Sequence, residues 1–432
     1  MTDTAGYGGP WKASAAEEFS PAASAAPAQK IESKYLRKFL TLEEFEAAAK
    51  RKLPRVLYGY AASGTETDAS LRQNRESYTA YGLVPRVLMG KRKRDMGVSL
   101  FGRRYSAPFG IAPMGASALF AYRADIRLAE AAKSADIPMV LSGASLIALE
   151  EVAQAAPGTW FQAYLPAHPE QIRRLLERLA RAGYETLVVT VDVPVPGNRE
   201  VDKRNGFNVT LKPSAGLIWD GITRPAWLVG TALRTTLLRG MPHLENYRAV
   251  RGPSILSRAD IRGGGAIERH GWAEIRLVRS LWKGNLVVKG ILSAADARLA
   301  QDCGVDGIVI SNHGGRQLDG AVAPLRVLPT IREAVPRLTV MIDGGIRRGT
   351  DMIKALALGS DFVFMGRPFL YAAAVGGADG VTRAIHLMRE EIQRDMVLLG
   401  IGSLSELDAS FVSEASCWTS CNRMNDMNFR TN

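Results

Sequence analysis

Cysteine is scarce in this sequence of 432 residues. The three cysteines, Cys303, Cys417 and Cys421, are too few for a disulfide framework. Cys417 and Cys421 have neither a second cysteine pair nor histidines nearby, so they do not indicate a zinc site, and we expect no metal. The expected location is therefore a reducing compartment, the cytoplasm.

Long apolar runs are also missing. No run reaches the about 18 apolar residues that a membrane-spanning helix needs, so we expect no such helix. The N-terminus has no apolar segment behind a basic start, which argues against a secretory signal.

The charge balance is strongly basic, with a formal net charge of +12 and a pI near 9.7. Such a charge favours nucleic acid, an anionic membrane surface or anionic ligands as partners. The arginines are spread along the chain and no nucleic-acid-binding motif occurs, so we expect no nucleic acid partner. A membrane surface combined with an anionic substrate fits better. A peripheral position on the inner face of the cytoplasmic membrane is a prediction of this kind.

Composition divides the chain into three parts. Residues 1–35 are rich in Ala, Ser, Pro and Gly and show no steady period, which predicts a disordered N-terminal extension. Residues 413–432 are predicted to be a C-terminal tail. The folded domain is predicted over residues 36–412, and a hydrophobic share of 47% with 23% charged residues is typical of a globular protein.

Eight β-rich apolar runs alternate with helical patterns in this domain. These runs are PFGIAPM (108–114), IPMVLSG (137–143), WFQAYL (160–165), TLVVTVD (186–192), LVVKGI (286–291), GIVISN (307–312), VMIDGG (340–345) and FVFMGR (362–367). Because each helix returns the chain to the same edge, the strands are expected to pair in parallel. Eight such units favour a closed (β/α)₈ TIM barrel, an α/β fold, with a doubly wound open sheet as the alternative.

The chain between the fourth and fifth runs, residues 193–285, is too long for an ordinary loop. It is predicted to be an insertion on the C-terminal face of the barrel. Its segment 214–241 interleaves tryptophan and aliphatic side chains with Arg224, Arg234 and Arg239. That composition is typical of a segment lying in a membrane interface, and a lid helix folded onto the barrel is the other interpretation. Composition leaves both open.

Glycines and arginines follow the last two runs. The motifs DGGIRRG and GRP contain Arg347 and Arg367 and predict a phosphate site, because glycines let backbone N–H groups approach an anion. Lys289 lies in a buried apolar run and needs a partner, which is either a carboxylate in a structural salt bridge or the electron-rich edge of a cofactor.

His313 differs from the other four histidines because it stands just past the sixth run, with Arg316 three residues later. Asp192 ends the fourth run and is expected on the same face of the barrel. A histidine beside a carboxylate can act as a general base, and an arginine next to it can hold a substrate carboxylate through two hydrogen bonds.

Several of these motifs together resemble a known family. SNHGGRQLDG (311–320), with VVKGI, DGGIRRGTD, ALALG and GRP, is similar to the FMN-dependent L-2-hydroxyacid dehydrogenases and oxidases. These include glycolate oxidase, lactate oxidase and the bacterial membrane-associated lactate and mandelate dehydrogenases, the group that the sequence resembles most. The likeness runs from about residue 40 to about residue 410. It implies FMN-dependent oxidation of an L-2-hydroxyacid to the 2-oxoacid, in a homo-oligomer that is commonly a tetramer.

The resemblance also implies roles for residues that match the family's motifs. His313 matches the base, and Asp192 matches the carboxylate that stabilises its protonated form. The matching substrate-binding residues are Tyr60, Tyr164, Arg199 and Arg316. The matching FMN-binding residues are Pro113, Met114, Gly115, Ser142, Gln162, Thr190, Lys289, Ser311, Asp343, Gly345, Arg347, Gly366 and Arg367.

Two departures bear on substrate and electron acceptor. Ala144 stands where the glycolate oxidases carry tryptophan, which leaves room for a larger substrate side chain. Gly115 stands where many oxidases carry alanine, and the insertion ending RGMPHLENY is similar to that of the mandelate dehydrogenases, which docks to the membrane. These features favour a dehydrogenase that passes electrons to a quinone or cytochrome over a peroxide-producing oxidase that uses O₂.

Two further alternatives remain. One is a flavin-binding scaffold or sensor without turnover, and the other is a phosphate-binding barrel enzyme with different chemistry. The SNHGGRQLDG motif argues against both, because neither requires a base beside a carboxylate-binding arginine.

Overall fold

Eight parallel strands form a barrel in the structure, a computed structural model that describes residues 33–90, 93–208, 210–211, 215–257 and 270–414. The strands are β4 (Phe109–Ile111), β5 (Val140–Ser142), β6 (Trp160–Ala163), β7 (Thr186–Thr190), β10 (Asn285–Ile291), β11 (Gly307–Ile310), β12 (Thr339–Asp343) and β13 (Phe362–Met365). Their order is β4-β13-β12-β11-β10-β7-β6-β5, and a parallel bridge between Ile111 and Met139 joins the two ends. This closure confirms the predicted (β/α)₈ barrel over the open sheet.

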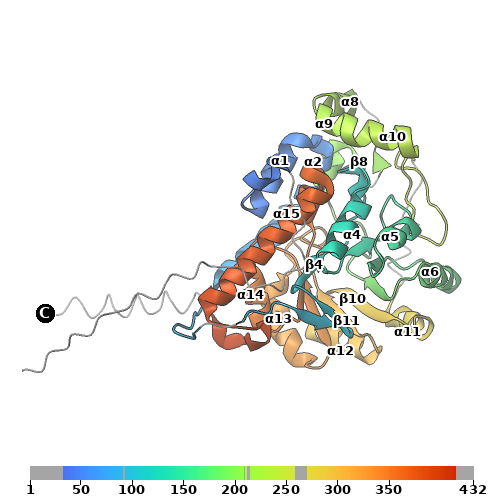
Figure 1. Cartoon of the computed structure of the whole chain (residues 1–432). Helices are drawn as coiled ribbons and strands as arrows, with labels where there is room; N and C mark the ends of the chain where they lie inside the picture. Colours follow the sequence, from blue (N-terminus) through green and yellow to red (C-terminus); the bar gives the residue numbers. More distant parts are fainter. Residues whose placement is uncertain (1–32, 91–92, 209, 212–214, 258–269, 415–432) are drawn as a thin grey trace, which may run out of the picture. The chain divides into compact units, whose positions relative to one another are not determined.

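A helix follows each strand and covers the outside of the barrel (Figure 1). These helices are α4 (Ala124–Ser134), α5 (Leu149–Ala155), α6 (Pro169–Arg181), α11 (Trp272–Leu281), α12 (Ala294–Asp302), α13 (Pro324–Ala334), α14 (Gly349–Ala357) and α15 (Arg367–Leu399). Each strand is buried along its length except at single positions, so both of its faces are covered, as expected for parallel strands between helices.

The N-terminal end of the barrel is closed by a hairpin of β2 (Val98–Leu100) and β3 (Arg103–Tyr105). Leu100 and Tyr105 pack with side chains that point into the barrel, among them Trp160. The Trp160 indole Nε1 donates to the Tyr105 hydroxyl at 3.2 Å. Because this end is plugged, only the C-terminal ends of the strands are open to a ligand.

Three helices precede the barrel: α1 (Leu42–Lys52), α2 (Arg55–Ala62) and α3 (Ala69–Glu76). The first begins where the Thr41 hydroxyl accepts a hydrogen bond from the backbone N–H of Glu44. The 3₁₀ turns are η1 (Leu36–Lys38), η2 (Ser77–Ala80), η3 (Ser117–Leu119), η6 (Leu404–Glu406) and η7 (Ala409–Phe411).

Strand β1 (Tyr81–Leu83) pairs with β14 (Val412–Glu414), so the fold continues two residues past the predicted boundary at 412. Residues 1–32 and 415–432, which hold most of both predicted tails with Cys417 and Cys421, lie outside the described residues.

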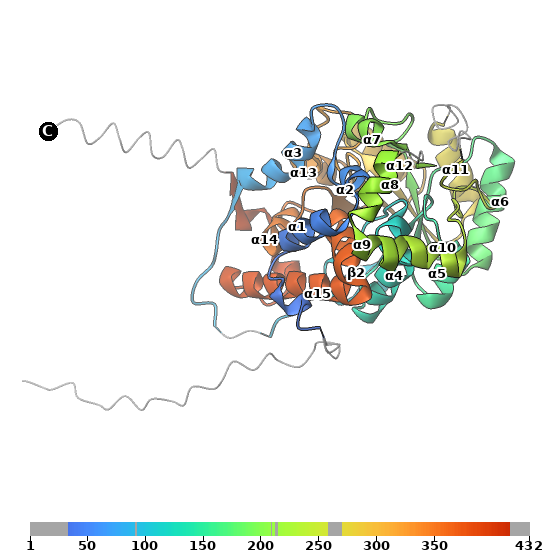
Figure 2. The ribbon, with the colours of Figure 1, turned by 90° about the horizontal axis from the view of Figure 1, so that it is seen from above.

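The insertion after β7 contains several short elements before α11. They are α7 (Glu200–Asn205), β8 (Phe207–Asn208), β9 (Thr210–Leu211), α8 (Ala215–Ile222), α9 (Pro225–Trp227), the π-helical turn η4 (Leu228–Leu233) and α10 (Arg234–Arg239). Helices α8 to α10 run along one edge of the barrel beside α2 (Figures 1 and 2). No helix in the described part of the chain is long and apolar enough to cross a membrane.

Candidate active site

A single pocket at the C-terminal ends of the barrel strands collects most of the predicted residues. Those that line it are Tyr60, Pro113, Met114, Gly115, Ser142, Gln162, Tyr164, Thr190, Arg199, Lys289, His313, Arg316, Asp343, Gly345, Arg347, Gly366 and Arg367. The two other predicted residues, Asp192 and Ser311, lie behind it and bond to His313 and Lys289. The barrel therefore brings residues from α2 and from all eight strand exits to one place.

His313 and Asp192 form a hydrogen-bonded pair, with 2.9 Å between imidazole Nδ1 and carboxylate Oδ1. Burial, together with Lys289 and Arg316, lowers the pKa of His313 and outweighs the opposing effect of Asp192. Burial disfavours the charged Asp192 carboxylate, but His313 and Lys289 outweigh burial and lower its pKa. The pair therefore combines a neutral imidazole with an ionised carboxylate, which is the arrangement of a general base with its stabilising partner.

His313 is held in an uncommon backbone conformation. Its φ is +57°, and Gly314 and Gly315 follow with φ of +66° and +75°. Glycine is needed at position 315, because a Cβ there would lie 2.6 Å from the backbone nitrogen of Leu71. A non-glycine residue with positive φ is uncommon and costs free energy, and at an active site such strain is part of how a reacting group is positioned.

An amide pair that the sequence analysis missed supports this turn. Asn312 and Asn74 exchange two side-chain hydrogen bonds, of 2.7 and 2.8 Å, and both side chains are buried. The Asn312 Oδ1 also accepts from the backbone N–H of Gly315 at 3.1 Å. Asn74 lies in α3, and no local pattern in the sequence connects α3 with the sixth strand.

Lys289 has a carboxylate partner, one of the two alternatives that the sequence left open, and it also lies at the pocket. Its Nζ lies 3.1 Å from the Asp343 Oδ2 and donates to the Ser311 hydroxyl at 2.7 Å, while its side chain also lines the pocket. Burial lowers the pKa of Lys289, but Asp343 and Asp192 outweigh burial and keep the ammonium charged. The Ser311 hydroxyl also accepts from the backbone N–H of His313 at 3.0 Å, so it links the lysine to the base.

Two guanidinium groups flank the ring of Tyr60. The Cζ of Arg316 lies 4.7 Å from the ring centroid, and the Cζ of Arg199 lies 5.9 Å from it. Arg199 comes from the start of the insertion, and its Nη1 is 3.4 Å from Asp202. Burial and the neighbouring Arg199 lower the pKa of Arg316, and an arginine remains protonated in this state. An anionic ligand is therefore favoured at this end of the pocket.

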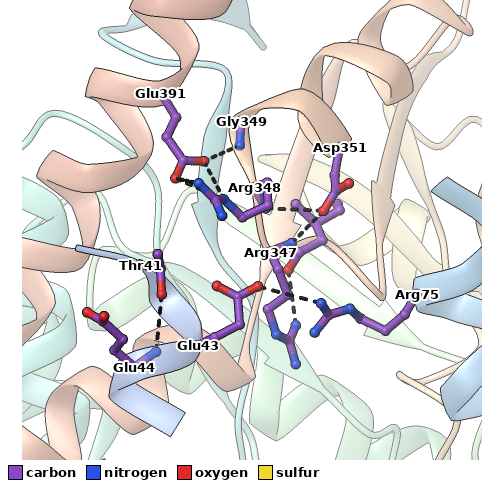
Figure 3. A network of polar contacts seen from close by, with 10 residues as sticks. Thr41, Glu43, Glu44, Arg75, Arg347, Arg348, Gly349, Asp351 and Glu391 are labelled. Atoms are coloured by element: carbon purple, nitrogen blue, oxygen red, sulfur yellow. Dashed lines mark hydrogen bonds and ion pairs between the residues drawn. The ribbon is translucent and has the colours of Figure 1, made fainter. Parts of the chain in front are cut away.

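Arg347, in the loop before α14, also lines the pocket. Figure 3 shows how this loop is fixed: Asp351 accepts from the backbone N–H groups of Arg347 and Arg348, at 3.0 and 3.1 Å. Glu391 of α15 accepts from the backbone N–H of Gly349 at 2.6 Å and pairs with the Arg348 guanidinium at 2.8 Å. These acidic groups stabilise the N-terminus of α14 and hold Arg347 at the pocket wall.

A second ion pair, also missed by the sequence analysis, lies beside Arg347 in Figure 3. Arg75 of α3 and Glu43 of α1 are 3.5 Å apart. Burial and then Arg75 lower the pKa of Arg347, while Glu46 and Glu43 oppose this shift. A buried guanidinium at the pocket wall can pair with an anionic group such as a phosphate, and the phosphate site stays a prediction.

The residues present fit a flavin. Gln162 Nε2 and Asp343 Oδ1 are buried pocket atoms without a hydrogen-bond partner in the protein. A polar ring edge and a ribityl chain offer the acceptors and donors that such atoms need. Among the described residues, no group of three or more His, Cys, Asp or Glu side chains is placed to hold a metal ion.

The pocket also contains apolar residues that were not predicted as site residues. Val193, Phe207, Leu244 and Tyr247 line it beside Ala144 and come from the insertion or its start. Their only sequence signal is their place in an insertion on the functional face of the barrel. Periodicity could not identify which of its side chains turn inward.

Comparison with known proteins agrees with this geometry. Residues 49–414 match the family model described as FMN-dependent dehydrogenase. The L-lactate dehydrogenase of Ectopseudomonas mendocina (strain ymp) is 39% identical over 376 residues, which cover 85% of this chain and 97% of that protein. The L-lactate dehydrogenase of Azorhizobium caulinodans is 39% identical over 371 residues, which cover 84% and 96%.

Solved structures show the same relationship. The monotopic membrane protein (S)-mandelate dehydrogenase matches with a TM-score of 0.79 at 33% identity, covering 87% of this chain and 99% of that one. Mandelate oxidase matches with a TM-score of 0.70 at 34% identity, covering 85% and 96%. Since the family model spans most of the chain and the relatives align over nearly their whole length, the protein belongs to the family of FMN-dependent dehydrogenases, enzymes with FMN as cofactor.

Proposed function

We propose that this FMN-dependent dehydrogenase oxidises an L-2-hydroxyacid to the 2-oxoacid, with His313 as the base. The observation that carries the proposal is the His313–Asp192 pair in a pocket whose one end holds Arg199 and Arg316. The names of the relatives support this substrate class, since they are lactate and mandelate enzymes.

Each part of the pocket has a role in this proposal. Arg199 and Arg316 bind the substrate carboxylate, and Tyr60 and Tyr164 contact the substrate from α2 and the end of β6. His313 removes a proton from the substrate, and the ionised Asp192 stabilises the imidazolium that forms.

The remaining predicted residues hold the cofactor. Lys289, Gln162, Ser142 and Thr190 would contact the flavin ring together with the loop Pro113–Gly115, while Asp343, Gly345, Arg347, Gly366 and Arg367 would hold the ribityl and phosphate groups. Ser311 supports Lys289 from behind. When bound, FMN would supply the two-electron acceptor of the oxidation, and we propose a membrane quinone as the final electron acceptor.

Membrane contact is proposed for residues 214–241, the docking segment, of which residues 215–241 are described. Its anchors face inward: the Trp227 Nε1 donates to the Leu119 carbonyl at 2.7 Å, and the buried Asp220 accepts from the backbone N–H of Val56 at 3.4 Å. Its exposed apolar residues are Ile218, Trp219, Ile222, Val229, Leu233, Leu237, Leu238 and Met241.

This exposure favours the membrane interpretation over the lid. Leu237 is 80% exposed, and the exposed Arg234 and Arg239 lie on the same helix. A lid would bury such a row of side chains, whereas a basic apolar surface suits anionic lipid headgroups. A peripheral position on the inner face of the cytoplasmic membrane would follow, and we expect a homo-oligomer, a tetramer, in solution.

The experiment on the function is anaerobic reduction of the purified yellow protein by a series of L-2-hydroxyacids, read as bleaching of the flavin absorbance. Reduction by at least one of them is expected, and no reduction by any would reject the proposal and favour the scaffold or sensor. Turnover with a quinone analogue, a cytochrome and O₂ then ranks the acceptors. Fast peroxide formation would favour the oxidase instead.

The experiment on membrane contact is sedimentation with vesicles that contain anionic lipids. The double variant Leu237→Ser/Leu238→Ser should lose binding, because it removes exposed apolar area. Leu398→Ser is the matched control, since Leu398 is 63% exposed on α15 and lies outside the docking segment. Equal binding of the double variant and the control would reject this part of the proposal.

A further inference from the structure

We propose that Leu244 and Tyr247 of the insertion form a side-chain wall that selects the substrate, and that the enzyme prefers an L-2-hydroxyacid with a bulky apolar side chain, aryl or branched, over one with a methyl group. The proposal rests on the proposed function and goes further by naming the substrate class.

The wall consists of apolar and aromatic surfaces. Tyr247 stacks on Tyr164, with ring centroids 5.8 Å apart and planes at 28°. Leu244 and Phe207 are each 1% exposed, yet both line the pocket together with Val193. Little of Leu244 and Phe207 is exposed, whereas the Tyr247 side chain is half-buried and offers apolar ring area that a substrate side chain can cover. The free energy gained is proportional to the apolar area covered.

The wall is fixed to the barrel by a buried amide. The Asn246 Oδ1 accepts from the backbone N–H of Leu149 at 2.9 Å, and its Nδ2 donates to the carbonyl of Ile147 at 2.7 Å. The backbone N–H of Glu245 donates to the carbonyl of Ser145 at 3.2 Å. Leu244 and Tyr247 therefore stand at set positions against the loop after β5, which also carries Ala144, and selection does not need the insertion to move.

Small residues lie near the wall. A Cβ built on Gly115 would be 3.0 Å from the Ala144 Cβ and 3.6 Å from the Tyr60 hydroxyl. The first of these distances shows that Gly115 packs closely against Ala144, so a side chain at position 115 would crowd this part of the pocket. Ala144, Tyr60, Leu244 and Tyr247 all line the pocket, and position 144 contributes only a methyl group to it. A larger residue at position 144 would fill the space that a bulky substrate side chain needs.

Charge at the wall narrows the class further. Leu244, Tyr247, Val193 and Phe207 carry no formal charge. Of the pocket arginines, Arg199 and Arg316 are assigned to the substrate carboxylate, and Arg347 and Arg367 are assigned to the cofactor. A second carboxylate on the substrate would be desolvated here without a partner, at a large cost. Hydroxy-diacids are therefore excluded as good substrates.

The test compares kcat/KM for L-mandelate, L-2-hydroxyisocaproate and L-lactate in the FMN-loaded enzyme. We expect kcat/KM for L-mandelate or for L-2-hydroxyisocaproate to exceed kcat/KM for L-lactate by about tenfold or more. An apolar pocket reaches this discrimination between a methyl group and a larger apolar group. Leu244→Ala and Tyr247→Ala should lower that ratio by about tenfold, and Ala144→Leu should reverse it by blocking the space. Leu256→Ala and Tyr35→Ala, at residues 40% and 53% exposed, are matched controls that should leave the ratio unchanged.

The outcomes separate the two proposals. If the enzyme oxidises hydroxyacids but L-lactate equals or exceeds the bulky substrates, the wall proposal is overturned while the function stands. If no hydroxyacid reduces the enzyme, both are overturned. If Tyr247→Ala loses its flavin, two other variants test the proposal. Tyr247→Phe keeps the stacked ring and should keep the preference for bulky substrates. An unchanged preference for bulky substrates in Ala144→Leu would overturn the wall proposal.

Discussion

Arg316 donates from Nη1 to the backbone carbonyl of Tyr60 at 2.6 Å, and its Cζ lies 4.7 Å from the ring of the same tyrosine. A second bond of 2.8 Å reaches the carbonyl of Ser63, and Arg367 donates to the carbonyls of Ala61 and Ser63. Two pocket arginines thus satisfy the carbonyl groups that the C-terminus of α2 leaves free. The helix that presents Tyr60 is therefore positioned by the same group that we propose to bind the substrate carboxylate.

Arg316→Lys should impair substrate binding and loosen α2 together. A lysine keeps the charge but cannot form the two-pronged bond to a carboxylate or reach both carbonyls at once. We expect KM to rise and kcat/KM to fall by about 100-fold, which corresponds to about 2.7 kcal/mol. Steady-state kinetics would measure this, with Arg337→Lys at an exposed position as the control. A KM equal to that of the control would contradict the role.

His313→Asn should retain FMN and lose substrate oxidation. Asparagine accepts the positive φ of position 313 better than most residues, so the turn should survive. Without a base, anaerobic flavin reduction should slow by about 10²–10⁴-fold. Stopped-flow absorbance gives the rate, and the flavin content of the purified variant shows that the cofactor site is intact. Near-normal reduction would remove His313 from the mechanism.

The pH profile of kcat/KM follows from the same pair. Burial lowers the pKa of His313, and the base works only when neutral, so activity should rise as pH increases through a value below 6.5 and then level off. Asp192→Asn removes the carboxylate that favours the imidazolium, so the pKa of His313 should fall further. The acid limb should then move to lower pH, while the plateau drops because the imidazolium is less stable.

A profile of kcat/KM between pH 4.5 and 8 would check both parts of this prediction, with flavin content measured at each end of the range. A limb that stays in place in Asp192→Asn, or moves to higher pH, would show that another group controls the titration.

The fold was largely predictable because each barrel strand is a short, continuous apolar run with a helix behind it. All eight predicted runs contain a strand of the barrel, although each strand except that at β10 is shorter than predicted at one or both ends. Strand ends are set by neighbouring strands and loops, which periodicity does not record. The pocket residues could be predicted for a related reason. A polar residue at the C-terminal end of a buried barrel strand is expected to lie at the functional face of the barrel.

Other parts of the site depend on contacts between distant segments. Asn74 reaches Asn312 across 238 positions, and Arg367 caps a helix 306 positions earlier. The Leu244–Tyr247 wall depends on how the insertion folds back onto the loop after β5. None of these contacts can be read from the local sequence, because each of them joins segments that are far apart in the chain.

Lys289→Met should destabilise the protein through the charge that it leaves behind. Asp343 would keep a buried carboxylate without its ammonium partner, which lies 3.1 Å away in the native pair. Breaking a buried pair costs about 3–5 kcal/mol, so the melting temperature of a domain of this size should fall by roughly 4–6 °C. The double variant Lys289→Met/Asp343→Asn removes both charges and should recover most of the loss.

Flavin affinity separates this structural effect from a role toward the cofactor. The double variant should still bind FMN more weakly than the wild type, because Lys289 lines the pocket and Asp343 has an unpartnered buried oxygen beside it. Equilibrium titration of the flavin-free proteins with FMN, followed by quenching of flavin fluorescence, would measure this. If the double variant recovers its stability and binds FMN as tightly as the wild type, Lys289 and Asp343 have only a structural role as an ion pair. If the double variant is as unstable as Lys289→Met, the unpaired carboxylate is not the cause of the lost stability.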